Sequence, residues 1–105
     1  TTMAFDGNIP KERSIACLDV EKLHLPLTLR KTLPGDRFAP FGMRGTKLVS
    51  DYLTDRKKSL IEKEKQLVVI DANGEIVWLV DERPSARCSI SEETKKTVRL
   101  EWEER

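Results

Sequence analysis

The sequence has few of the residues that usually bind metal ions or carry nucleophilic chemistry. Its 105 residues include a single histidine, His24, and two cysteines, Cys17 and Cys88. The cysteines form no Cys-x-x-Cys pair, so they cannot build a zinc knuckle without further ligands. We therefore expect no metal site. We interpret the cysteines as reduced, mostly buried thiols of a cytoplasmic protein, with a disulfide as the alternative.

Long hydrophobic segments are also missing. The longest wholly apolar runs, such as Ile76–Val80, are only a few residues long, so we expect no membrane span and no membrane partner. The opening TTMAFDGNIPKER has the pattern of neither a signal peptide nor a transit peptide. Because the chain begins without an initiator region of its own, we expect it to be a piece of a longer protein.

The near-neutral net charge of +1 hides a strong asymmetry along the chain. Residues 30–58 contain eight Lys and Arg against three Asp, whereas the remaining residues contain eleven bases against fifteen acids. A basic segment on an otherwise acidic body favours a local site for a polyanion.

Hydrophobic periodicity predicts five or six strands, beginning with a short strand at Ser14–Leu18. Leucines alternate with polar residues over Leu25–Lys31, which predicts a half-buried strand with Leu25, Leu27 and Leu29 facing the core. Pro34-Gly35-Asp36 is a typical turn sequence. Further proline and glycine residues predict irregular chain up to Thr46.

From Lys47 the period of the apolar residues changes to that of a helix. Its predicted buried stripe consists of Leu48, Val49, Tyr52 and Leu53. Lys57 and Lys58 follow, where basic residues suit the end of a helix dipole. Ser59 and Glu62 form the pattern of a capping box, which predicts a second short helix.

Asn73-Gly74 stands between the apolar runs Leu67–Ile70 and Ile76–Val80 and predicts a hairpin with a type I′ turn. Neither run alternates with polar residues, so both strands should be covered on both faces. A last strand is expected at Thr97–Trp102, with Val98, Leu100 and Trp102 inward. The fold class is α+β: a small sandwich of mixed or antiparallel sheets with one or two short helices. We assign residues 1–13 to an extension or linker and 14–105 to the domain.

The loop from Thr32 to Thr46 has the parts of a surface that binds a nucleic-acid backbone. Gly42 and Gly45 permit positive φ and close approach, so N–H groups between them could face phosphate oxygens. The loop and its flank also supply charge and flat apolar surface, from Arg37, Arg44, Lys47, Phe38 and Phe41. The alternative is a packed Ω-loop in which Asp36 pairs with Arg37 or Arg30 and both phenylalanines fill the core.

The order of these residues supports the first interpretation. The pattern PLTLRK…PGDRF.P.GM.G.K..SDY..D.K at Pro26–Lys57 resembles the C-terminal domain of tRNA(Ile)-lysidine synthetase. The resemblance extends over residues 14–102, through the apolar hairpin, Arg83, Arg87 and the last strand.

This resemblance implies a fold shared with the β chain of phenylalanyl-tRNA synthetase. It also implies a parent ligase that uses ATP, with magnesium, to join lysine to the wobble cytidine of an isoleucine tRNA. The module would hold the acceptor stem while a separate N-terminal domain catalyses. The SGGxDS loop that binds ATP in this family is absent from the chain, so we expect no cofactor and no catalytic residue here.

The expected partners are the isoleucine tRNA and the protein's own N-terminal catalytic domain, with a homodimer as a further option. The alternative function is a docking module that contacts proteins without touching RNA. We expect the RNA-binding residues to be Arg30, Lys31, Arg37, Gly42, Arg44, Gly45, Lys47, Arg56, Lys57, Lys58, Arg83 and Arg87.

Overall fold

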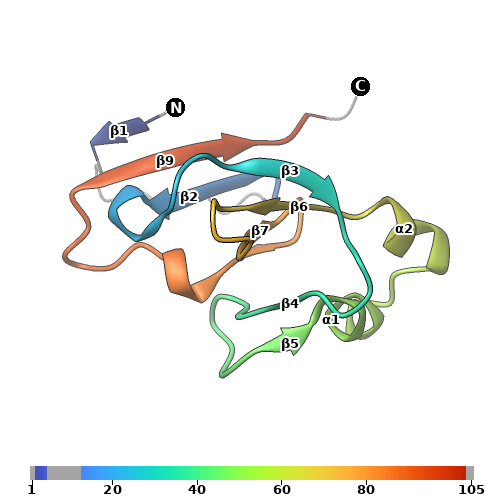
Figure 1. The fold of residues 1–105 in the computed structure, drawn as a ribbon. Coiled ribbons are helices and arrows are strands. Elements are labelled where there is room, and N and C mark those ends of the chain that lie inside the picture. The colour runs from blue at the N-terminus through green and yellow to red at the C-terminus, as the bar shows by residue number, and fades with distance from the viewer. Residues whose placement is uncertain (1, 5–12, 104–105) are drawn as a thin grey trace.

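The computed structural model describes residues 2–4 and 13–103, which form three antiparallel sheets and two short helices (Figure 1). The first sheet has the strand order β1-β9-β2, with β1 at Thr2–Ala4, β9 at Lys96–Glu101 and β2 at Ile15–Asp19. The second has the order β3-β6-β7-β8, at Thr28–Lys31, Leu67–Ile70, Ile76–Leu79 and Arg83–Pro84. The third pairs β4, Arg37–Phe38, with β5, Lys47–Leu48. The helices are α1, Val49–Asp55, and α2, Leu60–Lys65, and single 3-10 turns lie at Val20–Lys22 and Ala86–Cys88.

These elements confirm the α+β class, and every described strand pair is antiparallel. Neither described helix is long and apolar enough to cross a membrane. The sequence Gly7-Asn8-Ile9-Pro10 is typical of a turn, but it and most of the expected extension 1–13 lie outside the described residues. Within that extension, residues 2–4 pair with β9 as a strand.

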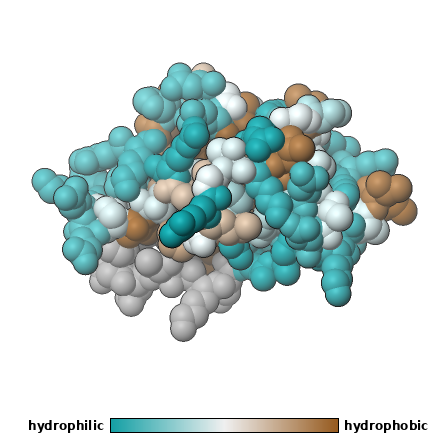
Figure 2. Space-filling model, turned by 90° about the horizontal axis from the view of Figure 1, so that it is seen from below, coloured by the Kyte–Doolittle hydropathy of each residue, from teal (hydrophilic) through white to brown (hydrophobic). Residues whose placement is uncertain are grey.

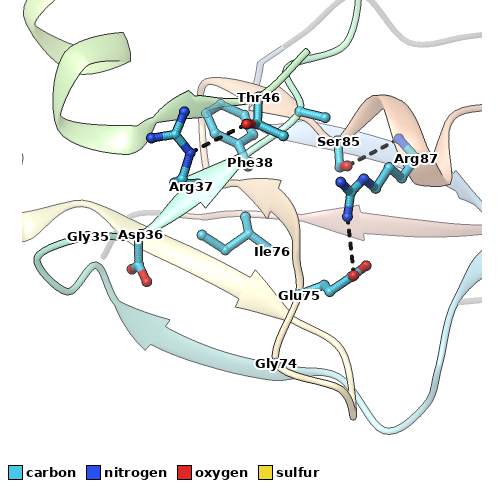
Figure 3. A pocket seen from close by; sticks show the side chains of 11 residues that line it. Gly35, Asp36, Arg37, Phe38, Thr46, Gly74, Glu75, Ile76, Ser85 and Arg87 are labelled. Atoms are coloured by element: carbon cyan, nitrogen blue, oxygen red, sulfur yellow. Dashed lines mark hydrogen bonds and ion pairs between the residues drawn. The ribbon is translucent and has the colours of Figure 1, made fainter.

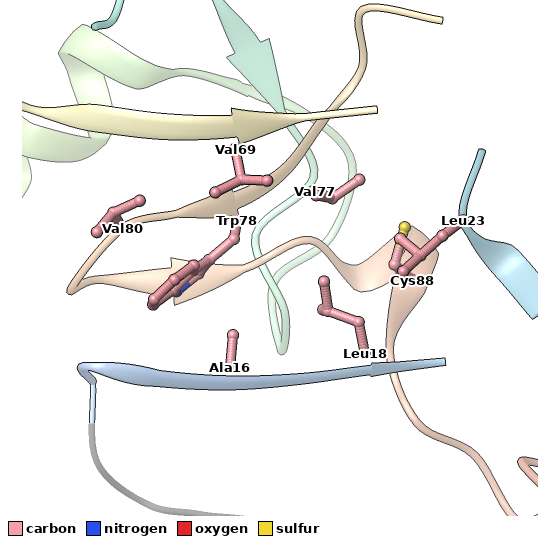
Figure 4. Close-up of a cluster of buried hydrophobic side chains, with 8 residues drawn as sticks. All are labelled: Ala16, Leu18, Leu23, Val69, Val77, Trp78, Val80 and Cys88. Atoms are coloured by element: carbon pink, nitrogen blue, oxygen red, sulfur yellow. The ribbon is translucent and has the colours of Figure 1, made fainter. Parts of the chain in front are cut away.

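The β6–β7 hairpin lies between two hydrophobic clusters, as its uninterrupted apolar runs predicted. One cluster packs the hairpin against β2 and contains Ala16, Leu18, Leu23, Val69, Val77, Trp78, Val80 and Cys88 (Figure 4). The other packs it against β4 and α1 and contains Phe38, Val49, Tyr52, Leu53, Val68, Ile76 and Leu79. The predicted helical stripe is therefore correct for Val49, Tyr52 and Leu53. The second cluster fixes the basic segment to the four-stranded sheet.

The predicted inward leucine face of the strand at 25–31 is wrong. The strand begins only at Thr28, and Leu25 and Leu29 are 63% and 50% exposed. Only Leu27 of the three leucines packs against a core cluster. β3 lies at the edge of its sheet and pairs only with β6, so the core is filled by the inner strands instead.

The hairpin at Asn73-Gly74 is confirmed, but its turn is not type I′. That type needs positive φ at both central residues, whereas Gly74 has φ 82° and Asn73 is not among the described residues with positive φ. Instead, the buried Asp71 carboxylate accepts N–H bonds from Asn73 and Glu75, and the Asp71 carbonyl accepts from Gly74. This side chain organises the reversal, because an Asp can bond to backbone groups just ahead of it.

The basic segment is more ordered than predicted, since β4 lies within the stretch expected to be irregular and pairs with β5, where the helix was expected to begin. Helix α1 starts at Val49 rather than Lys47 and ends at Asp55, so Lys57 and Lys58 lie beyond it. Lys57 adopts φ 60°, and the N–H groups of Lys57 and Lys58 bond to the carbonyls of Thr54 and Leu53. This is a Schellman ending. The capping box of α2 is confirmed, with both reciprocal Ser59–Glu62 bonds present.

Candidate nucleic-acid interface

The basic segment forms the side of the molecule made by β4, β5 and α1, below the four-stranded sheet in Figure 1. Seen from that side, hydrophilic side chains cover most of the surface (Figure 2). An apolar patch lies over α2 at one edge, where Leu60 and Ile61 are 76% and 64% exposed.

Asp36 fixes the start of the basic loop. Its carboxylate accepts bonds from Arg30 at 2.8 and 3.2 Å and from the Leu33 N–H at 2.7 Å. Partial burial alone would raise the pKa of the Asp36 carboxyl, but the bonds from Arg30 and Leu33, with the charge of Arg30, lower that pKa below its usual value. The same hydrogen bond raises the pKa of Arg30. Asp36 and Arg30 therefore have the structural pairing that the Ω-loop alternative predicted.

The middle of the loop agrees in part with the packed Ω-loop and in part with the surface that binds a nucleic-acid backbone. Phe38 is buried at 3% exposure and meets Tyr52 edge to face, with ring centroids 5.4 Å apart, whereas Phe41 is 47% exposed. Gly42 and Gly45 have φ 84° and 67°, and between them Arg44 is exposed. No side-chain bond or ion pair engages Arg44 among the described residues. The tip of the loop thus presents an exposed cation, Arg44, and an exposed aromatic ring, Phe41.

Arg83 supports this tip from the neighbouring strand β8. Its guanidinium donates to the Phe41 carbonyl at 3.1 Å and lies 5.8 Å from the centre of the Tyr52 ring. An isolated bridge between Pro40 and Ser85 ties the same two segments together. The structure therefore brings Arg83 to the middle of the loop, although Arg83 and Phe41 are about forty residues apart in sequence.

Arg37 and Arg87 line a hollow of about 290 Å³ between the loop and the β6–β7 hairpin (Figure 3). Arg37 donates to the Thr46 hydroxyl at 3.4 Å, and Arg87 pairs with Glu75 at 3.2 Å. The two residues come from different elements, β4 and the turn at Ala86–Cys88; the Arg87 guanidinium points toward Glu75, whereas that of Arg37 lies beside Thr46 (Figure 3). An anion in this hollow would meet two cations, Arg37 and Arg87, and two carboxylates, Asp36 and Glu75.

The end of α1 forms a third group of cations around the buried carboxylate of Glu82. Arg56 donates to Glu82 at 2.8 Å, and Lys58 and Arg13 lie 3.3 and 3.5 Å from it. The hydrogen bond to Glu82 raises the pKa of Arg56. Sequence reasoning missed both Glu82 and Arg13, because no periodicity marks an acid that folds inward and Arg13 fell in the expected linker.

The remaining predicted residues lie at the margins of this surface. Lys47 pairs with Asp55 of α1, and Lys31 is exposed on the edge strand β3. Lys57 is exposed beyond α1. The predicted set is therefore divided among the loop and its hollow, the end of α1 and the β3 edge.

Comparison with known proteins identifies the domain. No protein-family model matches the chain. A tRNA(Ile)-lysidine synthase of Bacteroides thetaiotaomicron is 46% identical over 93 residues, which cover 89% of this chain. One from Parabacteroides distasonis is 46% identical over 96 residues, or 91% of the chain. A solved TilS C-terminal domain (TilS is tRNA(Ile)-lysidine synthase) superposes with a TM-score of 0.81, at 23% identity, over 95% of this chain and 77% of its own. The chain belongs to the family of tRNA(Ile)-lysidine synthase C-terminal domains.

The domain spans only part of its curated relatives, covering 22% of the length of each of the two enzymes named above. Its fold is also that of an N-terminal fragment of the phenylalanyl-tRNA synthetase β-subunit from Pyrococcus horikoshii. That structure has a TM-score of 0.70 at 20% identity, over 81% of this chain and 26% of the fragment. The expected fold of the lysidine-synthase C-terminal domain and its expected likeness to the phenylalanyl-tRNA synthetase β chain are thus both confirmed.

Proposed function

We propose that this domain is the tRNA-binding module of a cytoplasmic tRNA(Ile)-lysidine synthase and grips the acceptor stem of an isoleucine tRNA by its backbone. In this proposal a separate N-terminal domain uses ATP and magnesium to attach lysine to the wobble cytidine. The domain contributes affinity and position, and its own residues perform no bond-making step.

The observation that carries the proposal is the exposed Arg44 at the tip of a loop that is fixed at its start and at its middle. Asp36 and Arg30 hold the start of the loop, and Arg83 holds its middle through the Phe41 carbonyl. A stem of A-form RNA hides its base edges in a deep, narrow groove, so a protein reads it mainly through phosphates and ribose hydroxyls. Fixed arginines on a hydrophilic surface suit that kind of contact.

The hollow beside the loop adds two further contacts of the same kind. Arg37 is exposed and bonds only to the Thr46 hydroxyl among the described residues, so its charge remains available to a phosphate. Arg87 is paired with Glu75 but keeps 59% of its side-chain surface exposed. Together with Arg44, these residues would follow a backbone across the loop and the hairpin.

A second candidate function is docking against another domain of the same enzyme, or against a second copy. It is favoured by the exposed apolar side chains of α2 and of the turn before β4. Leu33 is 59% exposed, and it lines a hollow of about 230 Å³ together with Val49, Leu53 and Leu60. This surface lies at the edge of the basic side, so docking and RNA binding do not exclude each other.

Titration of labelled tRNA(Ile) and of its isolated acceptor stem tests the proposal. Arg44→Ala should weaken binding to any stem sequence, and it should lower the slope of log K against log salt by somewhat under ~1 unit, because one phosphate contact is lost. Lys95→Ala removes one charge from the exposed segment before β9 and serves as the matched control. If the two variants behave alike across the salt series, the loop is not the RNA site and docking becomes the leading function.

A further inference from the structure

Glu82 joins three distant segments of the chain through one buried carboxylate. It follows β7, and its side chain is only 4% exposed. Arg56 Nε and Arg13 Nη1 both lie on its Oε1 atom, at 2.8 and 3.5 Å, and Lys58 Nζ lies 3.3 Å from Oε2. The cations come from the residues before β2 and from the end of α1.

The cluster holds more positive charge than burial of the acid requires. A buried carboxylate is costly unless it is paired, but a single well-placed cation meets that need. Three cations share Glu82, and one of them, Lys58, also lies 3.8 Å from Glu62, so the cluster keeps an excess of one positive charge. Their side chains remain 36%, 29% and 48% exposed for Arg56, Lys58 and Arg13, so the excess faces solvent while the acid does not.

The orientation of Arg56 leaves donors for a further acceptor. Only its Nε atom donates to Glu82, and a guanidinium carries two terminal NH₂ groups beyond Nε. Lys58 is fixed through its backbone by the bond to the Leu53 carbonyl, while its Nζ also lies 3.8 Å from Glu62. Arg56 is thus held through Nε and Lys58 through its backbone, while the terminal NH₂ groups of Arg56 and the ammonium group of Lys58 stay accessible.

This cluster continues the surface of the basic loop. Arg83, the next residue after Glu82, lies over the Tyr52 ring and donates to the Phe41 carbonyl in the loop. The Tyr52 carbonyl in turn accepts the backbone N–H of Arg56. An RNA backbone on the loop could therefore extend across Arg83 to the end of α1.

We propose that Glu82 is a positioning residue for RNA binding, whose buried carboxylate holds Arg56 and Lys58 as a preformed phosphate contact beside the loop. The inference rests on the proposed function of the domain. It makes an unusual prediction, because removing an acid from a polyanion-binding surface should weaken binding. If Glu82 merely neutralised the cations, its removal would free them and strengthen binding.

The test compares Glu82→Gln with Glu92→Gln, which makes the same change in charge at an exposed position outside the cluster. Both are titrated with labelled acceptor-stem duplex over a salt series, at a temperature where melts show both to be folded. We expect Glu82→Gln to weaken binding several-fold and to reduce the salt slope, and Glu92→Gln to leave binding unchanged or slightly tighter. Equal or tighter binding by Glu82→Gln overturns the proposal.

Arg56→Lys is a second variant that tests the positioning role of Glu82. It keeps the charge at position 56, and it can be measured even if Glu82→Gln does not fold. It should weaken binding, because an ammonium cannot bond to Glu82 and present a guanidinium fork at the same time. In an Arg56→Ala, Lys58→Ala background, Glu82→Gln should have no further effect on RNA affinity, because the two cations that Glu82 positions are absent. If Glu82 were purely structural, Glu82→Gln in the wild-type background would lower the melting temperature without changing the affinity. Wild-type-like binding by Arg56→Lys contradicts the proposal.

The proposed function is tested separately in the same series. If the wild-type chain does not bind the duplex, or if Arg44→Ala is silent, both proposals fail. If Arg44→Ala weakens binding while Glu82→Gln and Arg56→Lys do not, only the positioning role of Glu82 is refuted.

Discussion

Removing the Asp36 carboxylate should destabilise the domain in a way that depends on pH. The side chain of Asp36 is 14% exposed and that of Arg30 27%, and Asp36 accepts three hydrogen bonds, two of them from Arg30. Bonds to charged groups contribute about 1.5–3 kcal/mol each when well buried, and partial exposure reduces this. We expect Asp36→Ala to cost about 2 kcal/mol and to lower the melting temperature by about 8 °C.

The pH dependence follows from the lowered pKa of Asp36 in the folded state. The unfolded chain, with an Asp pKa of about 3.9, takes up the proton first as the pH falls. The stabilisation is therefore complete above that value and is lost as the pH falls through the folded pKa. Asp36→Asn keeps the shape but cannot ionise, so the gap between its melting temperature and that of wild type should narrow below about pH 4.

Thermal melts followed by circular dichroism from pH 7 to pH 3 measure this gap. Glu92→Gln, at an exposed position, is the control and should change stability by less than about 0.5 kcal/mol at neutral pH. A gap for Asp36→Asn that stays constant across the series would show that the carboxylate charge does not stabilise the loop. A gap near zero at pH 7 would refute the role of the Arg30 pair altogether.

Two further predictions concern the hairpin and the buried thiol. Gly74→Val should cost about 1–2 kcal/mol, because φ 82° strains a β-branched residue although space is open around the position, and RNA affinity of the folded fraction should not change. A loss of affinity without a change in melting would place that turn in the RNA site. Burial raises the pKa of the Cys88 thiol to about 11, so in a Cys17→Ser background it should react with a disulfide reagent at pH 8 far more slowly than in denaturant. Equal rates would show that Cys88 is accessible in the folded chain.

Local sequence patterns predicted the elements whose stability is local. The capping box of Ser59 and Glu62 and the α1 stripe around Tyr52 and Leu53 depend on residues three or four positions apart, and both are present. The hairpin at Gly74 was likewise predictable. Its turn type was not, because Asp71 organises the reversal through side-chain bonds that Asn-Gly alone does not indicate.

Contacts between distant segments were beyond the reach of these patterns. The two-residue strands β4 and β5 exist because they pair with each other, and neither has enough residues to show a period. The leucines of β3 alternate as in a half-buried strand, yet the edge position of β3 leaves Leu29 half exposed. The partners of Glu82 are separated from it by 24 residues or more, so only the folded chain reveals that acid as the centre of a cluster.

The predicted RNA-binding cations differ in whether a carboxylate of the domain pairs with them, and this difference affects how each cation would contribute to RNA binding. Arg30, Lys47, Arg56, Lys58 and Arg87 are each ion-paired with a carboxylate of the domain. Arg44 and Lys57 are exposed, and the described residues give neither an ion pair.

An unpaired surface arginine adds charge but loses conformational freedom when it binds, whereas a paired one is already ordered and offers fewer free donors. Mutation of Arg44 should therefore act mainly through the salt-dependent part of the affinity. Mutation of Glu82 should act through the geometry of two cations at once. Arg56→Lys separates these two contributions, because it keeps the net charge of the segment, so a loss of affinity in that variant reflects geometry and not charge.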